Sequence, residues 1–385
     1  MLRPARPRAI VPAPTARRAR GQEAAGYAAG RAAEHALREQ RREPFIRSPM
    51  RRAASAVLAL SLAACTRGAS VAAQPDTPAQ GPTSGVLLVA NQQAASASLI
   101  DLATGTVTEI PVGTGPHETA IASDGRLGVV TVYGAQQPGN QLAVIDMRAK
   151  RVLRTIDLGA YRRPHDVSFL PGSTTRVVVT SEASQKVVEV DLETGAVGPD
   201  AETRAQGSHM LALADDGKTL FTANIGAGGV SRVDLSTHAF VSQLPVAART
   251  EGIAITPNGR EVWVGSNTAG TVSIVDVASN AVVATLPSLG MPYRIGISRD
   301  GRRALIPDPE GNRVHVADVP ARRVIGEIAG IGSPRGVEFT PDGRTAFVTL
   351  GPENAVLVVD VEARRVLSTH RVGTAPDGVA WGPKT

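Results

Sequence analysis

One unit of about 42 residues recurs along most of this chain, and it limits the possible folds more than any other feature. Aspartate closes an apolar run at seven positions: Asp101, Asp146, Asp191, Asp234, Asp276, Asp318 and Asp360. The intervals between them are 45, 45, 43, 42, 42 and 42 residues. A near-constant period of this length indicates structural repeats that pack against their neighbours.

Each unit contains four short apolar runs separated by turn residues. In the unit that starts at Thr250 the first three runs read GIAIT, EVWVG and TVSIVDV, and Pro-Asn-Gly follows the first. Asn-Gly and Asp-Gly tolerate the positive φ that tight hairpin turns require. Four antiparallel strands per repeat are typical of a propeller blade. We therefore predict an all-β, seven-bladed β-propeller over residues 85–385.

The two ends of the repeat region complement each other. The chain enters at residues 85–113 with only the second, third and fourth strands of a blade, and residues 377–385 supply only a first strand. We expect these N- and C-terminal strands to share one blade, because that arrangement leaves no sheet edge open.

Two segments resemble a known repeat. Residues 334–344 read Pro-Arg-Gly-Val-Glu-Phe-Thr-Pro-Asp-Gly-Arg, and residues 142–146 read Leu-Ala-Val-Ile-Asp. They resemble the YVTN repeats of the YncE-like β-propeller family, and the resemblance extends over 85–385. It implies the fold but no single function, since related propellers include binding proteins, surface proteins, lactonases and domains of copper and haem enzymes. The chain has no Cys-x-x-Cys-His motif, so we expect no c-type haem.

The segment before the repeats resembles an export signal. Residues 50–64 contain two arginines and an apolar run that is too short to span a bilayer. Leu62-Ala63-Ala64-Cys65 resembles the lipobox of bacterial lipoproteins, in which the cysteine is acylated and becomes the mature N-terminus. We expect lipidation at Cys65, the only cysteine of the chain, and a membrane anchor on the periplasmic side. Ordinary cleavage after Ala73, giving a soluble periplasmic or secreted protein, is the alternative.

We divide the remaining N-terminal residues by composition. Residues 1–49 are rich in Arg, Ala and Pro and precede a complete signal, so we predict a non-native or disordered extension, with a transit peptide as the alternative. Residues 65–84 are rich in Ala, Pro, Gln, Gly and Ser, which predicts a flexible tether.

The distribution of charge argues against a nucleic-acid partner. The formal net charge is +6, but residues 1–64 carry 13 Arg and 4 Glu, which leaves 28 basic and 31 acidic residues in the rest. A nucleic-acid binder needs a basic surface. We predict instead a monomer that binds a small ligand or an envelope protein.

Alignment of the units identifies residues that should face one mouth of the central channel, just before the first strands. One set is His117, His165, His209, Glu251, Tyr293, Arg335 and Asp377, and the next positions are Glu118, Asp166, Met210, Gly252, Arg294, Gly336 and Gly378. The turns between second and third strands should frame the same mouth with Gln136, Glu182, Asn224, Asn267 and Asp308.

Three of the seven histidines of the chain occupy this position in consecutive units. Because equivalent positions converge around one axis, they could approach a single ion. The candidate metal ligands are His117, His165, His209, Glu118 and Asp166, a donor set that suits Zn²⁺, Cu²⁺ or Ni²⁺. Hydrogen bonding of the histidines to neighbouring loops, with no ligand at all, is an open alternative.

A second interpretation uses the opposite side of the same ring. Tyr293, Arg294 and Arg335 could hold an organic anion through forked hydrogen bonds to a carboxylate. The full set of predicted ligand-binding residues is therefore His117, His165, His209, Glu251, Tyr293, Arg294 and Arg335.

The resemblance also implies an enzymatic alternative, because propeller lactonases use His, Glu and Arg at the channel mouth. In that case Glu251 or His209 would be the base, and Arg294 or Arg335 would anchor the substrate. No nucleophile elbow, P-loop or dinucleotide fingerprint occurs. We therefore assign no catalytic residue and predict a non-catalytic cell-envelope propeller that binds a small ligand, metal ion or protein partner at this mouth. A lactonase-like hydrolase is the alternative.

Overall fold

The computed structural model describes residue 81 and residues 84–385 of the chain. The predicted extension (1–49), the signal peptide (50–64), the lipidation site Cys65 and most of the predicted tether (65–84) lie outside the described residues. Within the described part, 28 strands form seven antiparallel four-stranded sheets, which confirms the predicted all-β seven-bladed propeller. No helix in this part is long and apolar enough to span a bilayer.

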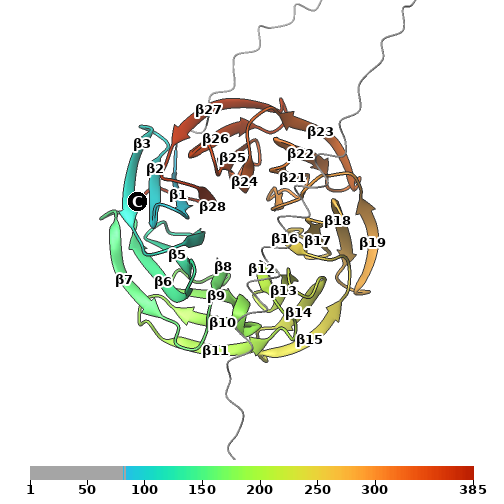
Figure 1. The fold of residues 1–385 in the computed structure, drawn as a ribbon, viewed down its shortest axis with the longest axis horizontal. Coiled ribbons are helices and arrows are strands. Elements are labelled where there is room, and N and C mark those ends of the chain that lie inside the picture. The colour runs from blue at the N-terminus through green and yellow to red at the C-terminus, as the bar shows by residue number, and fades with distance from the viewer. Residues whose placement is uncertain (1–80, 82–83) are drawn as a thin grey trace, which may run out of the picture. The chain divides into compact units, whose positions relative to one another are not determined.

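The sheets follow one another around a central axis, and each runs from an inner to an outer strand (Figure 1). The first three sheets are β28 (Pro376–Gly382), β1 (Val86–Asn91), β2 (Ser96–Asp101) and β3 (Thr106–Pro111); β4 (Pro116–Ile121), β5 (Leu127–Gly134), β6 (Pro138–Asp146) and β7 (Arg151–Asp157); β8 (Pro164–Phe169), β9 (Arg176–Ser181), β10 (Lys186–Asp191) and β11 (Val197–Glu202). A short 3₁₀ helix, Glu182–Ser184, follows β9.

The next four sheets are β12 (Ser208–Leu213), β13 (Thr219–Asn224), β14 (Val230–Asp234) and β15 (Ala239–Leu244); β16 (Thr250–Ile255), β17 (Glu261–Ser266), β18 (Thr271–Asp276) and β19 (Ala281–Leu286); β20 (Gly296–Ile297), β21 (Arg303–Asp308), β22 (Arg313–Asp318) and β23 (Arg323–Ala329); β24 (Pro334–Phe339), β25 (Thr345–Leu350), β26 (Ala355–Asp360) and β27 (Arg365–Arg371).

Strand β28 closes the ring as predicted. It pairs antiparallel with β1, so that residues from the two ends of the repeat region form one sheet, and Leu88 lies opposite Ala380. This pairing gives every inner strand a neighbour in its own blade.

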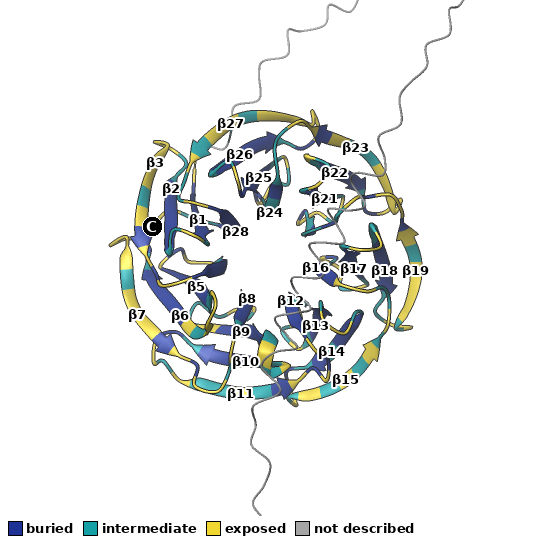
Figure 2. Ribbon diagram, in the orientation of Figure 1, coloured by how far each residue is buried: buried dark blue, intermediate teal, exposed yellow. Residues whose placement is uncertain are grey.

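The core lies between neighbouring blades. Along β9, Val177 and Val179 pack into one apolar cluster with the preceding blade, whereas Val178 packs into another with the following blade. Alternate side chains of a strand point to opposite faces, and here both faces are covered. The middle strands are therefore mostly buried along their length, and the outer strands carry most of the exposed positions (Figure 2).

The seven repeated aspartates stabilise the turns after the third strands. In each blade the carboxylate accepts a hydrogen bond from a backbone N–H two or three residues later, as Asp146 Oδ1 does from Ala149 N at 2.8 Å. Such side-chain to backbone bonds favour a turn over continued strand. The period that reveals the repeat in the sequence therefore has a structural cause.

One blade departs from the pattern. Its inner strand, β20, has only two residues, whereas the other inner strands have six or seven. Pro307 in the neighbouring strand β21 has no N–H to donate, although its carbonyl still accepts a hydrogen bond from Tyr293 N at 2.9 Å. The segment before β20 is therefore free of regular pairing, and it contains Arg294.

Candidate functional site

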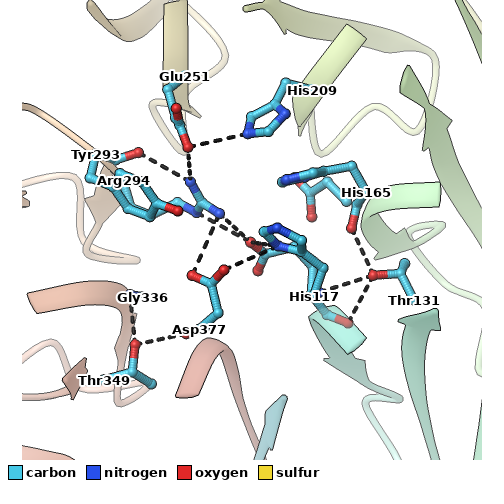
Figure 3. A network of polar contacts seen from close by, with 12 residues as sticks. His117, Thr131, His165, His209, Glu251, Tyr293, Arg294, Gly336, Thr349 and Asp377 are labelled. Atoms are coloured by element: carbon cyan, nitrogen blue, oxygen red, sulfur yellow. Dashed lines mark hydrogen bonds and ion pairs between the residues drawn. The ribbon is translucent and has the colours of Figure 1, made fainter. Parts of the chain in front are cut away.

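The aligned ring residues do converge at the start of the inner strands. They are the second residues of those strands rather than the residues just before them, because β4, β8 and β24 each begin at a proline one position earlier. Only Tyr293 precedes its strand. Figure 3 shows side chains from several inner strands directed at one another. Arg294 and Glu118 are 176 positions apart in the sequence, yet their side chains are 2.7 Å apart.

His117, His165 and His209 form a row of three rings. The ring centroids of His117 and His165 are 4.1 Å apart, and those of His165 and His209 are 3.5 Å apart. The middle residue, His165, is fully buried, and neither of its ring nitrogens has a hydrogen-bond partner within the described residues. Burial, reinforced by the neighbouring His209 and His117, holds the pKa of His165 well below its usual value. The ring is therefore neutral and has a lone pair available.

His209 is in the opposite electrostatic state. Its Nδ1 lies 2.8 Å from Glu182 Oε2, and its Nε2 lies 3.2 Å from Glu251 Oε1. Burial lowers the pKa of His209, but these two carboxylates outweigh burial and raise it to about 9. At neutral pH His209 is therefore an imidazolium that donates from both nitrogens. It has no free lone pair for a metal ion.

Arg294 crosses the centre and binds carboxylates on the far side. Its Nη2 and Nε donate to Glu118 Oε1 at 2.7 and 3.2 Å, and its Nη1 donates to Glu251 Oε1 at 2.9 Å. Asp377 Oδ1 lies 3.8 Å from Nη2. Burial opposes the charge of Arg294, but the carboxylates, Glu118 foremost, raise its pKa further above the ordinary value. Tyr293 contributes its ring face, 4.5 Å from the guanidinium carbon.

These contacts give the predicted anion site and the predicted hydrolase roles no support. Arg294 already donates to protein carboxylates, and Arg335 is half-buried with no hydrogen bond or ion pair among the described residues. Burial raises the pKa of Glu251, but His209 and Arg294 lower it to about 2, which makes the carboxylate a weak base. His209, being protonated, is also no base at neutral pH.

Asp166 takes a position different from that of a metal ligand. Its Oδ1 accepts from Val167 N at 2.7 Å, and its Oδ2 accepts from Leu211 N on the next inner strand at 2.9 Å. Burial and the charge of Glu118 raise the pKa of Asp166 to about 7. The carboxyl thus joins β8 to β12 through backbone groups.

The surrounding turns supply two of the residues expected to frame this mouth. Glu182 bonds His209, and Asn267 Nδ2 donates to Glu251 Oε2 at 2.6 Å. Sequence reasoning missed Tyr133, whose hydroxyl donates to Glu182 Oε1 at 3.1 Å and whose ring lies edge-on to His117 and His165. Only its place at the end of a second strand could have indicated this role.

Two groups of side chains have the spacing of metal ligands. His117, Glu118 and His165 each offer one atom within 4.8 Å of the others, and so do His165, Glu182 and His209. In the second group Glu182 and His209 already bond each other. In the first group His117 Nδ1 has no hydrogen-bond partner, although Asp377 Oδ2 lies 3.2 Å away. Two imidazole rings and a carboxylate therefore meet in the first group.

Comparison with known proteins supports the fold. Residues 177–342 match the family described as YNCE-like beta-propeller. A chain of Kuenenia stuttgartiensis hydrazine synthase is similar with a TM-score of 0.64 and 18% sequence identity, over 77% of this chain and 99% of that chain. At this identity the likeness shows the fold alone. No curated protein matches the sequence significantly.

Proposed function

We propose that this seven-bladed propeller, whose residues 177–342 are YNCE-like, binds one divalent transition-metal ion through His117, Glu118 and His165. The observation that carries the proposal is the state of His165. Both of its ring nitrogens are buried without a partner, and a buried polar group without a hydrogen bond costs about 1–3 kcal/mol. A metal ion accepts the lone pair of a neutral imidazole and removes that cost at one of the two nitrogens.

The charges around the three proposed ligands favour a divalent cation. Four carboxylates contact Arg294 or His209, namely Glu118, Glu182, Glu251 and Asp377. Against these four carboxylates Arg294 and the protonated His209 supply two positive charges, in a region shielded from water. Buried charges need compensation. One M²⁺ ion would offset the excess of carboxylates over these two cations.

The donor set narrows the choice of ion. Imidazole nitrogen with one carboxylate oxygen suits Zn²⁺, Cu²⁺ and Ni²⁺, whereas Mg²⁺ and Ca²⁺ prefer oxygen ligands alone. Ligating carboxylates are commonly oriented by a second hydrogen bond. Arg294 supplies that bond to Glu118.

Calorimetric titration tests the proposal on protein purified through a tag without histidine. We expect one Zn²⁺ per chain for the wild type and no binding for His165→Ala. His370→Ala is the matched control, since His370 lies on the outer strand β27 and should bind like the wild type. Wild-type protein that takes up no Zn²⁺, Cu²⁺ or Ni²⁺ would overturn the assignment.

We also propose that the propeller acts outside the cytoplasm, anchored by a lipid on Cys65. The support is the sequence Leu62-Ala63-Ala64-Cys65 after a short apolar run. Labelling of bacteria that express the protein with a radioactive fatty acid should mark the wild type and leave Cys65→Ser unlabelled. Equal labelling of both forms would contradict the anchor.

A further inference from the structure

We infer that Thr131 is a positioning residue for the metal ligands, an inference that rests on the proposed function. Thr131 lies on β5 and is fully buried. Its Oγ1 accepts a hydrogen bond from Glu118 N at 2.9 Å and donates one to His165 O at 2.8 Å (Figure 3). A single hydroxyl therefore joins the backbones of two ligand residues that belong to different blades.

The same bridge occurs at two other junctions. Thr180 Oγ1 accepts from Asp166 N at 2.9 Å and donates to His209 O at 2.7 Å. Thr349 Oγ1 accepts from Gly336 N at 2.7 Å and donates to Asp377 O at 2.7 Å. In every case the hydroxyl ties an inner strand of its own blade to the ring residue of the next blade.

The bridge is selective rather than a general property of the fold. The strand registers place Ala90, Ala223, Gly265 and Pro307 at the equivalent positions of the other four blades. None of these residues has a hydroxyl group. Threonine thus stands only before His165, His209 and Asp377. These three residues belong to the group of side chains that meet at the centre of the ring, which we call the central cluster: His117, Glu118, His165, Glu182, His209, Glu251, Arg294 and Asp377. Ala90 and Ala223 stand at the junctions before His117 and Glu251, which reach the centre without a hydroxyl bridge.

The two hydrogen bonds act on the distance between ligands. Glu118 and His165 are on separate sheets, and their side chains can meet at one ion only if β4 and β8 keep a fixed separation at their first residues. A residue that orients ligands from outside the coordination sphere typically contributes 10- to 100-fold to metal affinity. We expect that effect from the Thr131 hydroxyl.

Thr131→Val tests the inference, because it removes both hydrogen bonds and nearly keeps the shape. We expect Zn²⁺ affinity to fall by about 10- to 100-fold and the visible spectrum of bound Co²⁺ to change. Thr131→Ser keeps the hydroxyl and should restore affinity to within about threefold. Should the valine protein not fold, Thr131→Cys, a weak donor, should show the same loss.

Thr349→Val is the matched control, because it removes the same pair of bonds at a junction that contains no proposed ligand. It should lose comparable stability yet bind Zn²⁺ within about threefold of the wild type and leave the Co²⁺ spectrum unchanged. Equal affinities for Thr131→Val and Thr349→Val would overturn the positioning role while leaving the metal site in place. A wild type that binds no metal would overturn both.

Discussion

The two sides of the central cluster use the same position of the repeat in different ways. On the side formed by β4, β8 and β12, regular inner strands place imidazole rings in a row, and the position after each ring residue has a side chain. On the side formed by β16, β24 and β28 that next position is glycine. A Cβ on Gly252 would lie 2.7 Å from the Arg294 Cα, and one on Gly336 would lie 2.2 Å from the Asp377 carbonyl oxygen. Neighbouring backbones therefore approach closely there.

The difference shows how one repeat can build an asymmetric site. Close backbone approach beside Gly252 and the missing N–H of Pro307 leave Arg294 free to extend across the centre to Glu118. Strands β4, β8 and β12 provide the imidazole donors, and the segment before β20 provides Arg294, which neutralises part of the carboxylate charge. Each of the following changes removes one contact of this asymmetric site and measures its contribution.

The largest effect is expected from Arg294→Met, which removes the charge and nearly keeps the length of the side chain. It leaves Glu118, Glu251 and Asp377 buried without that partner, and breaking such a buried pair typically costs about 3–5 kcal/mol. Urea denaturation measures the loss. A loss of unfolding free energy below about 1 kcal/mol would show that the buried carboxylates do not depend on the charge of Arg294.

Alkaline pH should weaken the contact between His209 and its two carboxylates. Because folding raises the pKa of His209 from 6.5 to about 9, its contribution is full below pH 6.5 and is lost as pH rises through 9. The shift corresponds to roughly 3 kcal/mol. The unfolding free energy of the wild type should therefore fall more steeply across this window than that of His209→Gln. If the unfolding free energies of the two proteins changed with pH in parallel, His209 would not be protonated in the folded protein.

Thr180→Val should have an intermediate effect. It leaves Asp166 N–H and His209 C=O without their shared partner, at a cost of about 1–3 kcal/mol. Ala223→Val, at the equivalent position of the next blade, adds methyl groups but breaks no hydrogen bond. Hydrogen exchange at the Asp166 amide should accelerate only in the threonine variant, and an unchanged rate would contradict the bridge.

Arg335→Met should have the smallest effect on stability, although Arg335 occupies the same position of the repeat as the three histidines. Arg335 is half-buried and has no ion pair among the described residues, so we expect less than about 0.5 kcal/mol. Comparison with Arg294→Met in the same denaturation assay isolates the free energy that the buried ion pairs contribute to stability. Similar losses for the two arginines would contradict the structure.

Much of the fold could be predicted because each step depends on local patterns. The recurring aspartate gives the number of blades, and the incomplete first and last units give the closure of the ring. Convergence of His117, His165 and His209 then follows from symmetry alone. The identity of the irregular blade is harder to predict, although Pro307 in a second strand indicates it.

The partners within the cluster could not be predicted from the sequence. Alignment places Arg294 beside the ring, but only the folded structure shows that its guanidinium binds Glu118 and Glu251 instead of facing outward as an anchor. The protonation of His209 likewise depends on Glu182, which comes from a turn of another blade. A long side chain can reach several possible partners, and the repeat period does not determine which of them it binds. The bridging threonines, in contrast, recur 14 or 15 residues after a ring position and could have been noticed.

Diffraction from a Zn²⁺-soaked crystal, collected on both sides of the zinc absorption edge, tests the central claim most directly. We predict one anomalous peak bounded by His117, Glu118 and His165, with His209 still bonded to Glu182 and Glu251. A peak that includes His209 as a ligand, or a crystal with no peak among the three histidines, would contradict the account.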